Sequence, residues 1–352
     1  MALRYNYHNC CLLDHNEFIF NVYKDIVLNE KKFTIKFNNK LFCIKNTKNS
    51  VNNRKRKHDQ NIFTAETINV KNRYEKFKEN LLCNTEDKIQ KEFDDLTTKE
   101  VRELSQNLFE ATIFHYAGKS GGNNSETSLR CKIENDYFFI PPKCRFYCNC
   151  VKVQCANLYC KYDIIIADPP WWNKYIRRLK TANDKLSYSM MYNEDIASLP
   201  VKELLSKNCL IAVWCTNAPS CIEAVKSQIF PAWGLEYVTT WYWLKVTVDL
   251  EPICAFGSGC NKQPYERLII GKVGQINEIP KDRILISVPS ALHSHKPPLL
   301  DLLTPYVNVK KPEVLELFAR YLLPNTTSVG YEPLKWQHES LYELIENKNE
   351  VI

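Results

Sequence analysis

The chain has 352 residues, a formal net charge of +7 at pH 7 and 45% hydrophobic residues. Its length allows one catalytic domain of about 200 residues and one accessory region, each large enough to bury a core. No run of 18 apolar residues occurs, and Arg4, His8 and Asp14 interrupt the N-terminus, so we expect a soluble protein that is neither secreted nor held in a membrane. The 15 cysteines are odd in number and the context is not secretory, so we expect reduced thiols.

Residues 1–50 predict an accessory β-rich module. Residues 17–45 alternate polar side chains with aromatic and branched ones, as in 33–37, and this pattern is typical of a small sheet. Residues 31–58 contain ten Lys or Arg and no Asp or Glu, and we assign residues 51–63 to a basic linker. Such a strip attracts phosphates, serves as a nuclear import signal or is a solvated loop, and the sequence favours none of the three.

Residues 64–127 predict a helical arm followed by a flexible joint. The apolar residues of this region, such as Phe77 and Leu81, have helical spacing. Residues 118–120, Gly-Lys-Ser, resemble the end of a phosphate-binding loop, but Ile113 replaces the preceding glycine and no apolar strand leads in. Together with the Gly-Gly-Asn-Asn that follows, they indicate a joint rather than a nucleotide site.

Five cysteines lie close together in the sequence, namely Cys144, Cys148, Cys150, Cys155 and Cys160. Structural zinc sites usually pair their ligands two to four residues apart on two separate knuckles, and no Cys-x-x-Cys occurs in this chain. We therefore predict no metal site and interpret these thiols as small hydrophobic groups.

Residues 128–345 predict an α/β domain in which strands and helices alternate, as in a parallel sheet covered on both faces. The expected strands are 162–167, 209–215, 235–243, 266–271, 283–288 and 313–318. The expected helices are 194–206, 217–228 and 297–306.

The motif Asp168-Pro169-Pro170-Trp171 directly follows the apolar run 162–167. Two prolines end this strand at once, and the carboxyl ends of strands in open α/β sheets are where ligands bind, so Asp168 should lie in a crevice. Proline has no amide hydrogen and fixes φ, so we expect a stiff turn whose carbonyl oxygens have no neighbouring donor and are free to accept from a substrate.

These residue types suit the methylation of an exocyclic amine. The amine of adenine is a poor nucleophile because its lone pair is delocalised into the ring. A carboxylate and a carbonyl that accept its two hydrogens favour a localised lone pair and stabilise the charge that develops during attack. Trp171 offers an aromatic face for the base, since stacking contributes roughly 1–3 kcal/mol per base. The alternative is an ordinary turn with a packed indole.

The chain resembles the DPPW-motif N6-adenine methyltransferases, the MT-A70-like family that includes the mRNA adenosine methyltransferase, over about residues 128 to 338. The motif precedes the cofactor segment 316–320, which is the circularly permuted order of this family. The resemblance is strongest to the methyltransferase-like 4 branch, and it implies a Rossmann-like fold that uses S-adenosylmethionine. Besides the motif, the matching segments are 186–191, 213–217, 243–245, 265–266, 294–298, 316–320 and 335–338.

The resemblance implies a role for each matching residue of the cofactor site. Lys296 corresponds to the lysine that holds the methionine carboxylate, and an ammonium group on a long stem suits a charged head group. Arg320 and Glu332 would lie near the cofactor ribose, and Phe318 would pack against its adenosine. The residues expected to bind the cofactor are Asp168, Lys296, Phe318, Arg320, Glu332, Cys150 and Val151.

The same resemblance implies how the substrate is held. Tyr188 corresponds to an aromatic residue on a loop that closes over the target base, and Glu266 to a second acceptor near the reacting amine. Several cations follow the motif in a segment expected to be a mobile lid, where they would engage phosphates or form a solvated basic loop. The residues expected to bind substrate are Trp171, Tyr188, Glu266, Lys174, Arg177 and Arg178.

The chain departs from the family at three positions. Leu322 and Leu323 stand where relatives have a histidine and an asparagine that contact the cofactor, and Tyr331 stands where an asparagine follows the glycine. Family members that serve as RNA-binding scaffolds have an altered catalytic motif, whereas the motif is complete here. We therefore favour an active enzyme over a binding module with decayed cofactor contacts.

The expected activity is that of an RNA (adenosine-N6)-methyltransferase. A target adenine must be unstacked to reach the crevice, which favours single-stranded or looped RNA or a flipped DNA base. The resemblance implies an adenosine of small nuclear RNA, including one already 2′-O-methylated, with DNA adenine as the first alternative and a catalytically weak RNA-binding scaffold as the second. We expect a monomer, because the accessory module could take the place of a partner subunit, located in the nucleus or in nucleus and cytoplasm.

Overall fold

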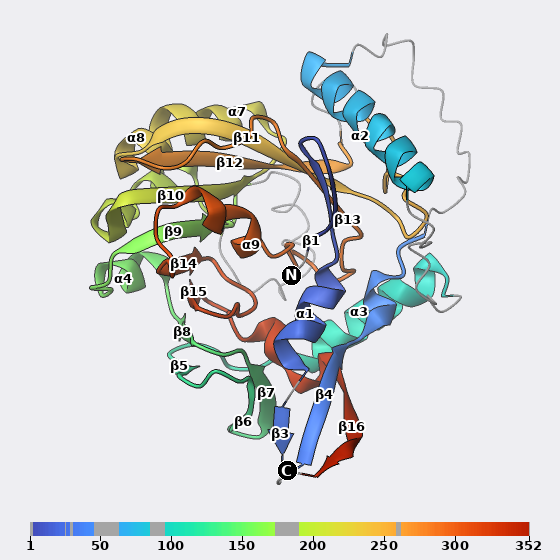
Figure 1. The fold of residues 1–352 in the computed structure, drawn as a ribbon. Helices are drawn as coiled ribbons and strands as arrows, with labels where there is room; N and C mark the ends of the chain where they lie inside the picture. The colour runs from blue at the N-terminus through green and yellow to red at the C-terminus, as the bar shows by residue number, and fades with distance from the viewer. Residues whose placement is uncertain are drawn as a thin grey trace.

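The structure is a computed structural model that describes residues 3–24, 26–28, 31–45, 63–84, 96–172, 190–257 and 262–351. Within them, 11 strands form one large sheet (Figure 1). In spatial order the strands are β1 (Leu3–Tyr7), β2 (Cys10–Leu13), β13 (Ile284–Ser287), β11 (Glu236–Lys245), β12 (Tyr265–Val273), β10 (Leu205–Cys215), β9 (Tyr162–Ala167), β14 (Val314–Leu317), β15 (Thr326–Gly330), β8 (Cys144–Cys148) and β5 (Ser120–Asn123). Two smaller sheets hold β16 (Tyr342–Val351), β4 (Lys31–Phe37) and β3 (Ile26–Leu28), and β6 (Leu129–Ile133) with β7 (Asp136–Ile140).

The six strands that the sequence predicts for the catalytic part are present, and β10, β9, β14, β15 and β8 pair in parallel. The expectation of a parallel sheet is wrong at β12, which runs antiparallel to both β10 and β11. Parallel neighbours need a long crossover, whereas antiparallel ones can be joined by a loop. The chain between β11 and β12 has no helix in its described residues, so the antiparallel arrangement follows.

The strands at the centre of the sheet are buried on both faces. In β9, Ile165 and Ala167 face one core and Ile164 and Ile166 face the other, as the alternation of side chains in a strand requires. A strand without a solvated face appears in the sequence as a continuous apolar run, which is why this strand could be predicted so closely.

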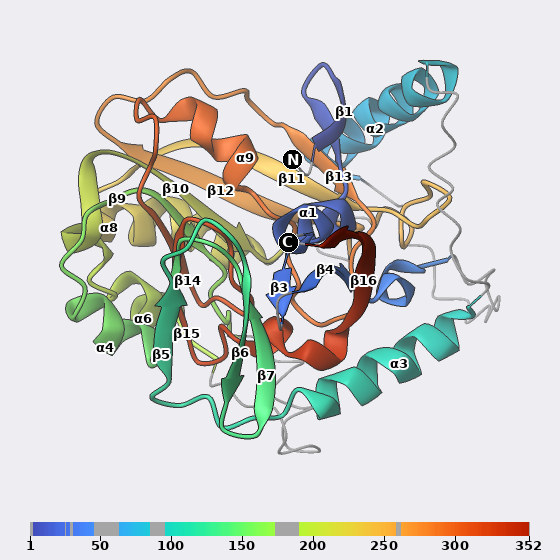
Figure 2. The same ribbon diagram turned by 60° about the horizontal axis from the view of Figure 1, so that its bottom comes forward.

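Short helices cover both faces of the sheet (Figure 2). On one face lie α4 (Val151–Ala156), α6 (Asn193–Ala197), α7 (Pro219–Ala224) and α8 (Phe230–Trp233), with a π-helical turn at Val225–Ile229 between the last two. On the other face lies α9 (Leu300–Leu303), which continues as a 3-10 turn at Thr304–Tyr306. The single helix expected at 194–206 is interrupted, because Pro200 separates α6 from a 3-10 turn at Val201–Leu204.

The N-terminal region contains a helix where we expect only a small sheet. Strands β3 and β4 confirm part of that expectation, but α1 (His15–Tyr23) contradicts the rest. Asp14 caps α1 by accepting the Glu17 N–H at 2.8 Å, and Ile19 and Tyr23, four residues apart, bury one face of the helix. Strand β4 then pairs with β16 near the other end of the chain (Figure 1).

The helical arm consists of α2 (Ala65–Asn84) and α3 (Thr98–Ala111). Helix α2 packs on the end of the sheet formed by β11, β13 and β2. The residues that α2 buries are spaced by three or four, and they are Thr67, Val70, Tyr74, Phe77 and Leu81. Residues 118–124, where we expect a flexible joint, contain the edge strand β5, which pairs with β8. The boundaries between accessory module, linker, arm and catalytic domain stay a prediction.

The arrangement is a Rossmann-like α/β fold with N-terminal α+β additions. From β9 the chain first builds towards β10, and only much later does it return to form β14 on the other side of β9. The strand order therefore changes direction between β9 and β14, which is where open α/β sheets bind ligands.

Candidate active site

Asp168 lies where the strand order of the sheet changes direction. Ala167, the last residue of β9, pairs with Leu317, the last residue of β14, so the two strands end level. The backbone N–H of Asp168 donates to the Leu317 carbonyl at 3.2 Å and holds the start of the motif against β14. Asp168 is thus displayed at the carboxyl edge of the sheet, as its position after a buried strand predicts.

The turn that follows is held by its own hydrogen bonds. The Trp171 N–H donates to the Pro169 carbonyl and the Met191 N–H to the Pro170 carbonyl, each at 2.8 Å. The expectation that both carbonyls lack a neighbouring donor is therefore wrong, because Trp171, two residues further on, supplies the donor to Pro169, and Met191, from a later segment, supplies the donor to Pro170. A carbonyl oxygen has two lone pairs, so each can still accept one bond from a ligand.

Trp171 is more deeply buried than a stacking platform needs to be. Its side chain packs in the core beside β9, the residue is 7% exposed, and its indole N–H donates to the Trp214 carbonyl at 2.9 Å. It lines the cavity described next only with the small part that remains accessible. The hydrogen bond of the Trp171 indole fixes the motif to the end of β10.

A cavity of about 370 Å³, here called the larger cavity, opens beside the motif. Its volume lies within the range of small-molecule sites. One wall is the motif, and the other walls come from the ends of β10, β11 and β12 and from residues 293–296. Beyond the motif, the lining includes Trp214, Asn217, Lys245, Tyr265, Glu266 and Lys296.

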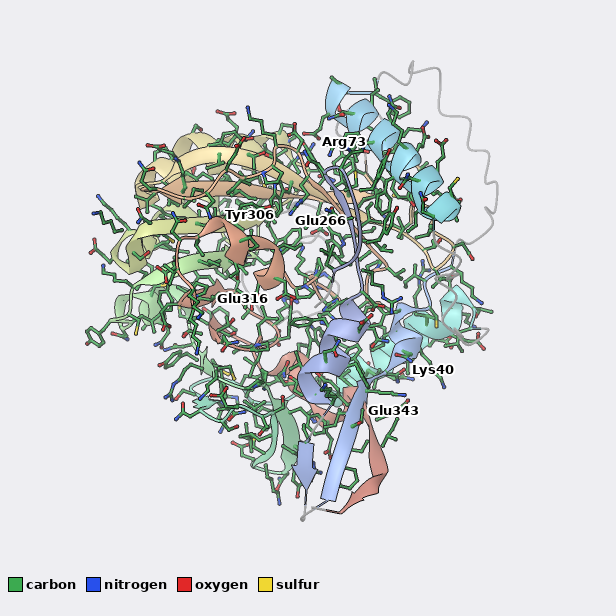
Figure 3. All side chains as sticks on the ribbon, viewed as in Figure 1. Lys40, Arg73, Glu266, Tyr306, Glu316 and Glu343 are labelled. Carbon is green, nitrogen blue, oxygen red and sulfur yellow. The ribbon has the colours of Figure 1, made fainter. Side chains whose placement is uncertain are left out.

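Four ionised side chains meet in the larger cavity and form what we call the ion cluster. Glu266, labelled in Figure 3, makes ion pairs with both Lys245 and Lys296. The Lys296 ammonium lies 3.6 Å from the Asp168 carboxylate. Lys296 also lies 5.2 Å from the ring centroid of Trp214, and Lys245 lies 4.5 Å from that of Trp243. Two acids and two bases cancel, so the cluster is neutral while remaining strongly polar.

The surroundings shift the pKa values of this cluster in opposite directions. Burial raises the pKa of Asp168, and the nearby charge of Glu266 adds to this effect. Burial also acts to raise the pKa of Glu266, but the charges of Lys296 and Lys245 outweigh it and lower that pKa to about 2. Glu266 thus remains a carboxylate, while Asp168 is the group in the cluster more ready to take a proton.

A second, smaller cavity of about 40 Å³ lies on the other side of the motif. It is lined by Asp168 and Pro170 together with Phe318, Ala319, Arg320, Tyr331 and Glu332. Asp168 and Pro170 therefore line both cavities. Arg320 lies 3.3 Å from the His293 ring, which lines the larger cavity, and this contact links the two cavities a second time.

The backbone of the smaller cavity has an unusual conformation at Phe318. This residue has a φ of 63°, in the left-handed region that bulky residues rarely adopt. The turn is possible because Gly330, at the end of β15, leaves room for it, since a Cβ there would lie 2.7 Å from the Ala319 carbonyl oxygen. Strained residues of this kind often mark ligand sites.

Some predicted site residues do not line either cavity. Val151 is a buried core residue in the first turn of α4, and Cys150 precedes it and hydrogen-bonds Tyr331 on the rim of the smaller cavity. Their cofactor role stays a prediction. Lys174, Arg177, Arg178 and Tyr188 lie outside the described residues. Among the described residues, no three His, Cys, Asp or Glu side chains are grouped as a metal site requires.

The three residues that depart from the family pattern lie in two environments, the apolar core and the lining of the smaller cavity. Leu322 and Leu323 are 3% and 2% exposed and belong to apolar cores, and neither lines the smaller cavity. Tyr331 lines the cavity and is 46% exposed. Two departures therefore extend the core, and only Tyr331 changes the lining of the cavity.

Comparison with known proteins agrees with this geometry. Residues 162–332, which contain β9, β14, the motif and both cavity walls, match the MT-A70 family. The chain carries an MT-A70 domain. This family consists of S-adenosylmethionine-dependent methyltransferases, and the Rossmann-like fold with the motif before the cofactor segment agrees with it.

Three relatives illustrate the match. The N(6)-adenine-specific methyltransferase METTL4 of Homo sapiens is 34% identical over 241 residues, which cover 64% of this chain and 49% of the relative. The DNA N6-methyl methyltransferase of Caenorhabditis elegans is 40% identical over 211 residues, covering 58% and 55%. The N6-methyladenosine RNA methyltransferase MTA1 of Cryphonectria parasitica is 39% identical over 181 residues, covering 50% and 53%. The chain matches about half the length of these relatives.

Two residues of the MT-A70 domain that matter for the site were missed in the sequence. Lys245 lies at the end of β11 in a segment that resembles the family, yet only its pairing with Glu266 reveals a role. Glu316, also labelled in Figure 3, lies on β14, and burial together with the charge of Asp168 raises its pKa to about 8. Its Oε2 has no hydrogen-bond partner. An acidic residue within an apolar strand was the available signal for it.

Within the described residues, none of the helices combines the length and the apolar composition that a membrane crossing requires.

Proposed function

We propose that the MT-A70 domain transfers a methyl group from S-adenosylmethionine to the N6 amine of adenine in nucleic acid. The observation that carries this proposal is that Asp168 and Pro170 line both cavities. A group that two cavities share can touch an amine bound in one and a methyl donor bound in the other. The relatives named as N6-adenine methyltransferases support the same reaction.

The residues around the smaller cavity suit the nucleoside part of the cofactor. Phe318 offers an aromatic face, and Glu332 and Arg320 offer a hydrogen-bond acceptor and donors for ribose hydroxyls. Lys296 would hold the carboxylate and Asp168 the ammonium of the methionine part. A cavity of about 40 Å³ is smaller than an adenosyl group, so the exposed Tyr331 side chain has to move on binding. When bound, S-adenosylmethionine supplies an electrophilic methyl group.

The larger cavity would hold the base. The Asp168 carboxylate and the free lone pair of the Pro169 carbonyl would accept the two hydrogens of the amine, with Glu266 as a further acceptor. This arrangement would localise the nitrogen lone pair and stabilise the positive charge that grows on the amine as it accepts the methyl group. The methylated nitrogen must then release one proton. Asp168, whose pKa is raised by burial, is the carboxylate in place to receive it.

We propose RNA as the polymer, specifically an adenosine of small nuclear RNA, including one that already carries a 2′-O-methyl group. Support comes from the resemblance to the METTL4 proteins and from the relative that is named an RNA methyltransferase. DNA adenine is the alternative, supported by the relative from Caenorhabditis elegans that is named a DNA N6-methyl methyltransferase. The cations at 174, 177 and 178 would contact the phosphates of either polymer.

We further propose that the protein acts as a monomer in the nucleus. In support, strands β1 and β2 extend the sheet of the catalytic part, and β4 pairs with β16, so the N-terminal region covers surfaces that a partner could otherwise occupy. Sedimentation of the purified chain tests the first part, and an obligate complex would contradict it. Imaging of a chain with neutralised residues 54–57 tests the second, with retention in the cytoplasm as the expected result.

Mass spectrometry of nucleosides tests the reaction. The protein would be incubated with labelled S-adenosylmethionine and either small nuclear RNA or adenine-containing DNA, with Asp168→Ala as the control. We expect N6-methyladenosine from RNA and none from the control. Methylation of DNA alone would support the alternative. No transfer to either polymer, together with no saturable cofactor binding, would support the RNA-binding scaffold that the departures at 322, 323 and 331 left open.

A further inference from the structure

We propose that Glu66, on helix α2 of the N-terminal arm, is a positioning residue for the wall of the larger cavity. The inference rests on the proposed function, because that wall is argued to hold the target base. Glu66 does not line the cavity, so it acts through the side chains that do. The proposal gives the arm a role in the reaction beyond covering the sheet.

The Glu66 carboxylate accepts hydrogen bonds from three side chains of the sheet. The hydroxyl groups of Tyr242 and Tyr265 donate to its two oxygens, each at 3.0 Å. Arg267 forms an ion pair with one oxygen and donates from Nε to the other at 3.4 Å. The Arg267 side chain is only 11% exposed, so its buried charge needs this partner for compensation.

These contacts continue to the cavity wall. Arg267 donates a third hydrogen bond to Oδ1 of Asn217, and Nδ2 of Asn217 donates to the Tyr265 carbonyl at 2.9 Å. Asn217 and Tyr265 both line the larger cavity. The orientation of the Asn217 amide is thereby fixed from both ends, and one N–H and one lone pair remain to meet a ligand.

The strand that carries this connection also carries part of the ion cluster. Side chains alternate along β12, so Tyr265 and Arg267 point towards α2 while Glu266 points towards Lys296. Helix α2 itself is anchored by Tyr74 and Phe77, which pack on the same end of the sheet (Figure 1). A shift at the end of β12 would therefore change both the Asn217 wall and the acceptor Glu266.

The first test compares Glu66→Gln with Glu75→Gln. Glutamine keeps the size of the side chain but turns one acceptor oxygen into a donor that faces Arg267 or a tyrosine hydroxyl. Glu75 lies on the same helix in an exposed pair with Lys71 and serves as the matched control. We expect kcat/KM for nucleic acid to fall about tenfold in Glu66→Gln, with the Kd for S-adenosylmethionine unchanged within twofold, and no change in Glu75→Gln.

A purely structural role is separated by a double-variant cycle. If Glu66 acts through Asn217, then Glu66→Gln should have little further effect on kcat/KM in an Asn217→Ala background. Equal losses in both backgrounds, or a loss of stability with unchanged kcat and KM, would overturn the proposal.

Hydrogen exchange makes the test independent of activity. We expect faster amide exchange at residues 213–217 and 265–267 in Glu66→Gln than in Glu75→Gln, measured on the full chain by mass spectrometry. If the unaltered protein transfers no methyl group, the proposed function fails, while faster exchange at these residues still supports the connection. Unchanged exchange in a protein that is active would overturn the positioning role of Glu66.

Discussion

The two cavities that meet at Asp168 differ in their chemistry. The larger cavity contains four ionised groups in a neutral cluster, and each of them has a partner of opposite charge. The smaller cavity has aromatic residues on its rim beside the charged side chains of Arg320 and Glu332. The carboxylates of the larger cavity suit an amine that needs hydrogen-bond acceptors, whereas the aromatic side chains of the smaller cavity, with a charged acceptor and donor beside them, suit the base and ribose of a nucleoside. The comparison therefore assigns the base to the first and the nucleoside of the cofactor to the second.

The largest loss of activity is expected at Asp168, one of the two residues that line both cavities. Asp168→Asn keeps the shape of the side chain but removes the charge that stabilises the developing cation, so we expect methyl transfer to fall by about 10²–10³-fold. Because Asp168 also lines the smaller cavity, the Kd for S-adenosylmethionine should rise as well. Single-turnover kinetics and cofactor titration measure the two effects. A variant that loses transfer but binds cofactor normally would confine Asp168 to the larger cavity.

Glu266→Gln is expected to lower activity less than Asp168→Asn does and to act mainly on the larger cavity. The substitution leaves Lys245 and Lys296 with only one carboxylate, so we expect the free energy of unfolding to fall by about 2 kcal/mol and kcat by about tenfold. Binding of the nucleoside part of the cofactor should change little, because Glu266 does not line the smaller cavity, and any change in the Kd for S-adenosylmethionine should come through Lys296, with which Glu266 pairs. Chemical denaturation and steady-state kinetics give both values.

The double variant Glu266→Gln with Lys245→Met is the control for this experiment. It restores the balance of charge, so stability should recover while activity does not. If adenosine, which lacks the methionine part, no longer binds the single variant, the larger cavity holds the nucleoside of the cofactor, and the assignment of the two cavities has to change.

Much of this fold could be predicted because its central strands are buried on both faces. The run before Asp168 is apolar throughout 164–167, with Asp163 as the one polar residue near its start, so both its limits and its position in the sheet follow from the sequence. The antiparallel direction of β12 was harder to predict, because it depends on a loop connection. Helix α1 was also harder to predict, because it depends on a cap supplied by Asp14. The strand pairing of β4 with β16 joins residues about 300 positions apart, and no local pattern contains it.

The site could be predicted to the level of residue types but not of contacts. Asp168 was predicted by its place after a strand, and Glu266 and Lys296 by resemblance, yet no spacing shows that these three groups meet. The carbonyl of Pro170 illustrates the limit, because its donor, the Met191 N–H, comes from a segment far along the chain. Glu66 shows the same limit at greater distance, since 201 residues separate it from Arg267.

The buried carboxyl of Glu316, whose Oε2 has no hydrogen-bond partner, predicts a dependence of stability on pH. The pKa of this group is about 8 in the folded protein and near 4.5 in an unfolded chain, so between these values the folded state holds a proton that the unfolded state has lost. The stability that Glu316 contributes is complete below pH 4.5 and is lost as the pH rises to 8. Glu316→Gln, which does not titrate, should remove up to about 1.4 kcal/mol per pH unit of this slope.

Denaturation series from pH 5 to pH 8 on the protein without cofactor measure the slope. His15→Gln is a useful control, because burial lowers the pKa of His15 to about 3 and its effect has the opposite sign, with stability rising as the pH increases to 6.5. An unchanged slope in Glu316→Gln would mean that this carboxyl is already ionised in the folded protein over this pH range.

The smallest effect is a change in cofactor affinity, expected from a substitution at the rim of the smaller cavity. Tyr331→Asn shortens the one departure from the family that lines this cavity. Because the cavity is too small for an adenosyl group while the ring is in place, we expect the Kd for S-adenosylmethionine to fall by about two- to fivefold, below 1 kcal/mol, with kcat unchanged. Weaker binding would instead show that the Tyr331 ring stacks on the bound nucleoside.

A second measurement on Tyr331→Asn separates the effect of losing the hydroxyl group from the effect of losing the ring. Burial acts to raise the pKa of Cys150, but hydrogen bonds from the Val153 N–H and the Tyr331 hydroxyl outweigh it, and the pKa is lowered overall. Tyr331→Asn should therefore raise the pKa of the Cys150 thiol, measured by the pH dependence of its alkylation with Cys150→Ser as the blank. Tyr331→Phe removes the same hydroxyl but keeps the ring. It should raise the thiol pKa equally while leaving the cofactor Kd unchanged, which assigns the change in affinity to the space that the ring occupies.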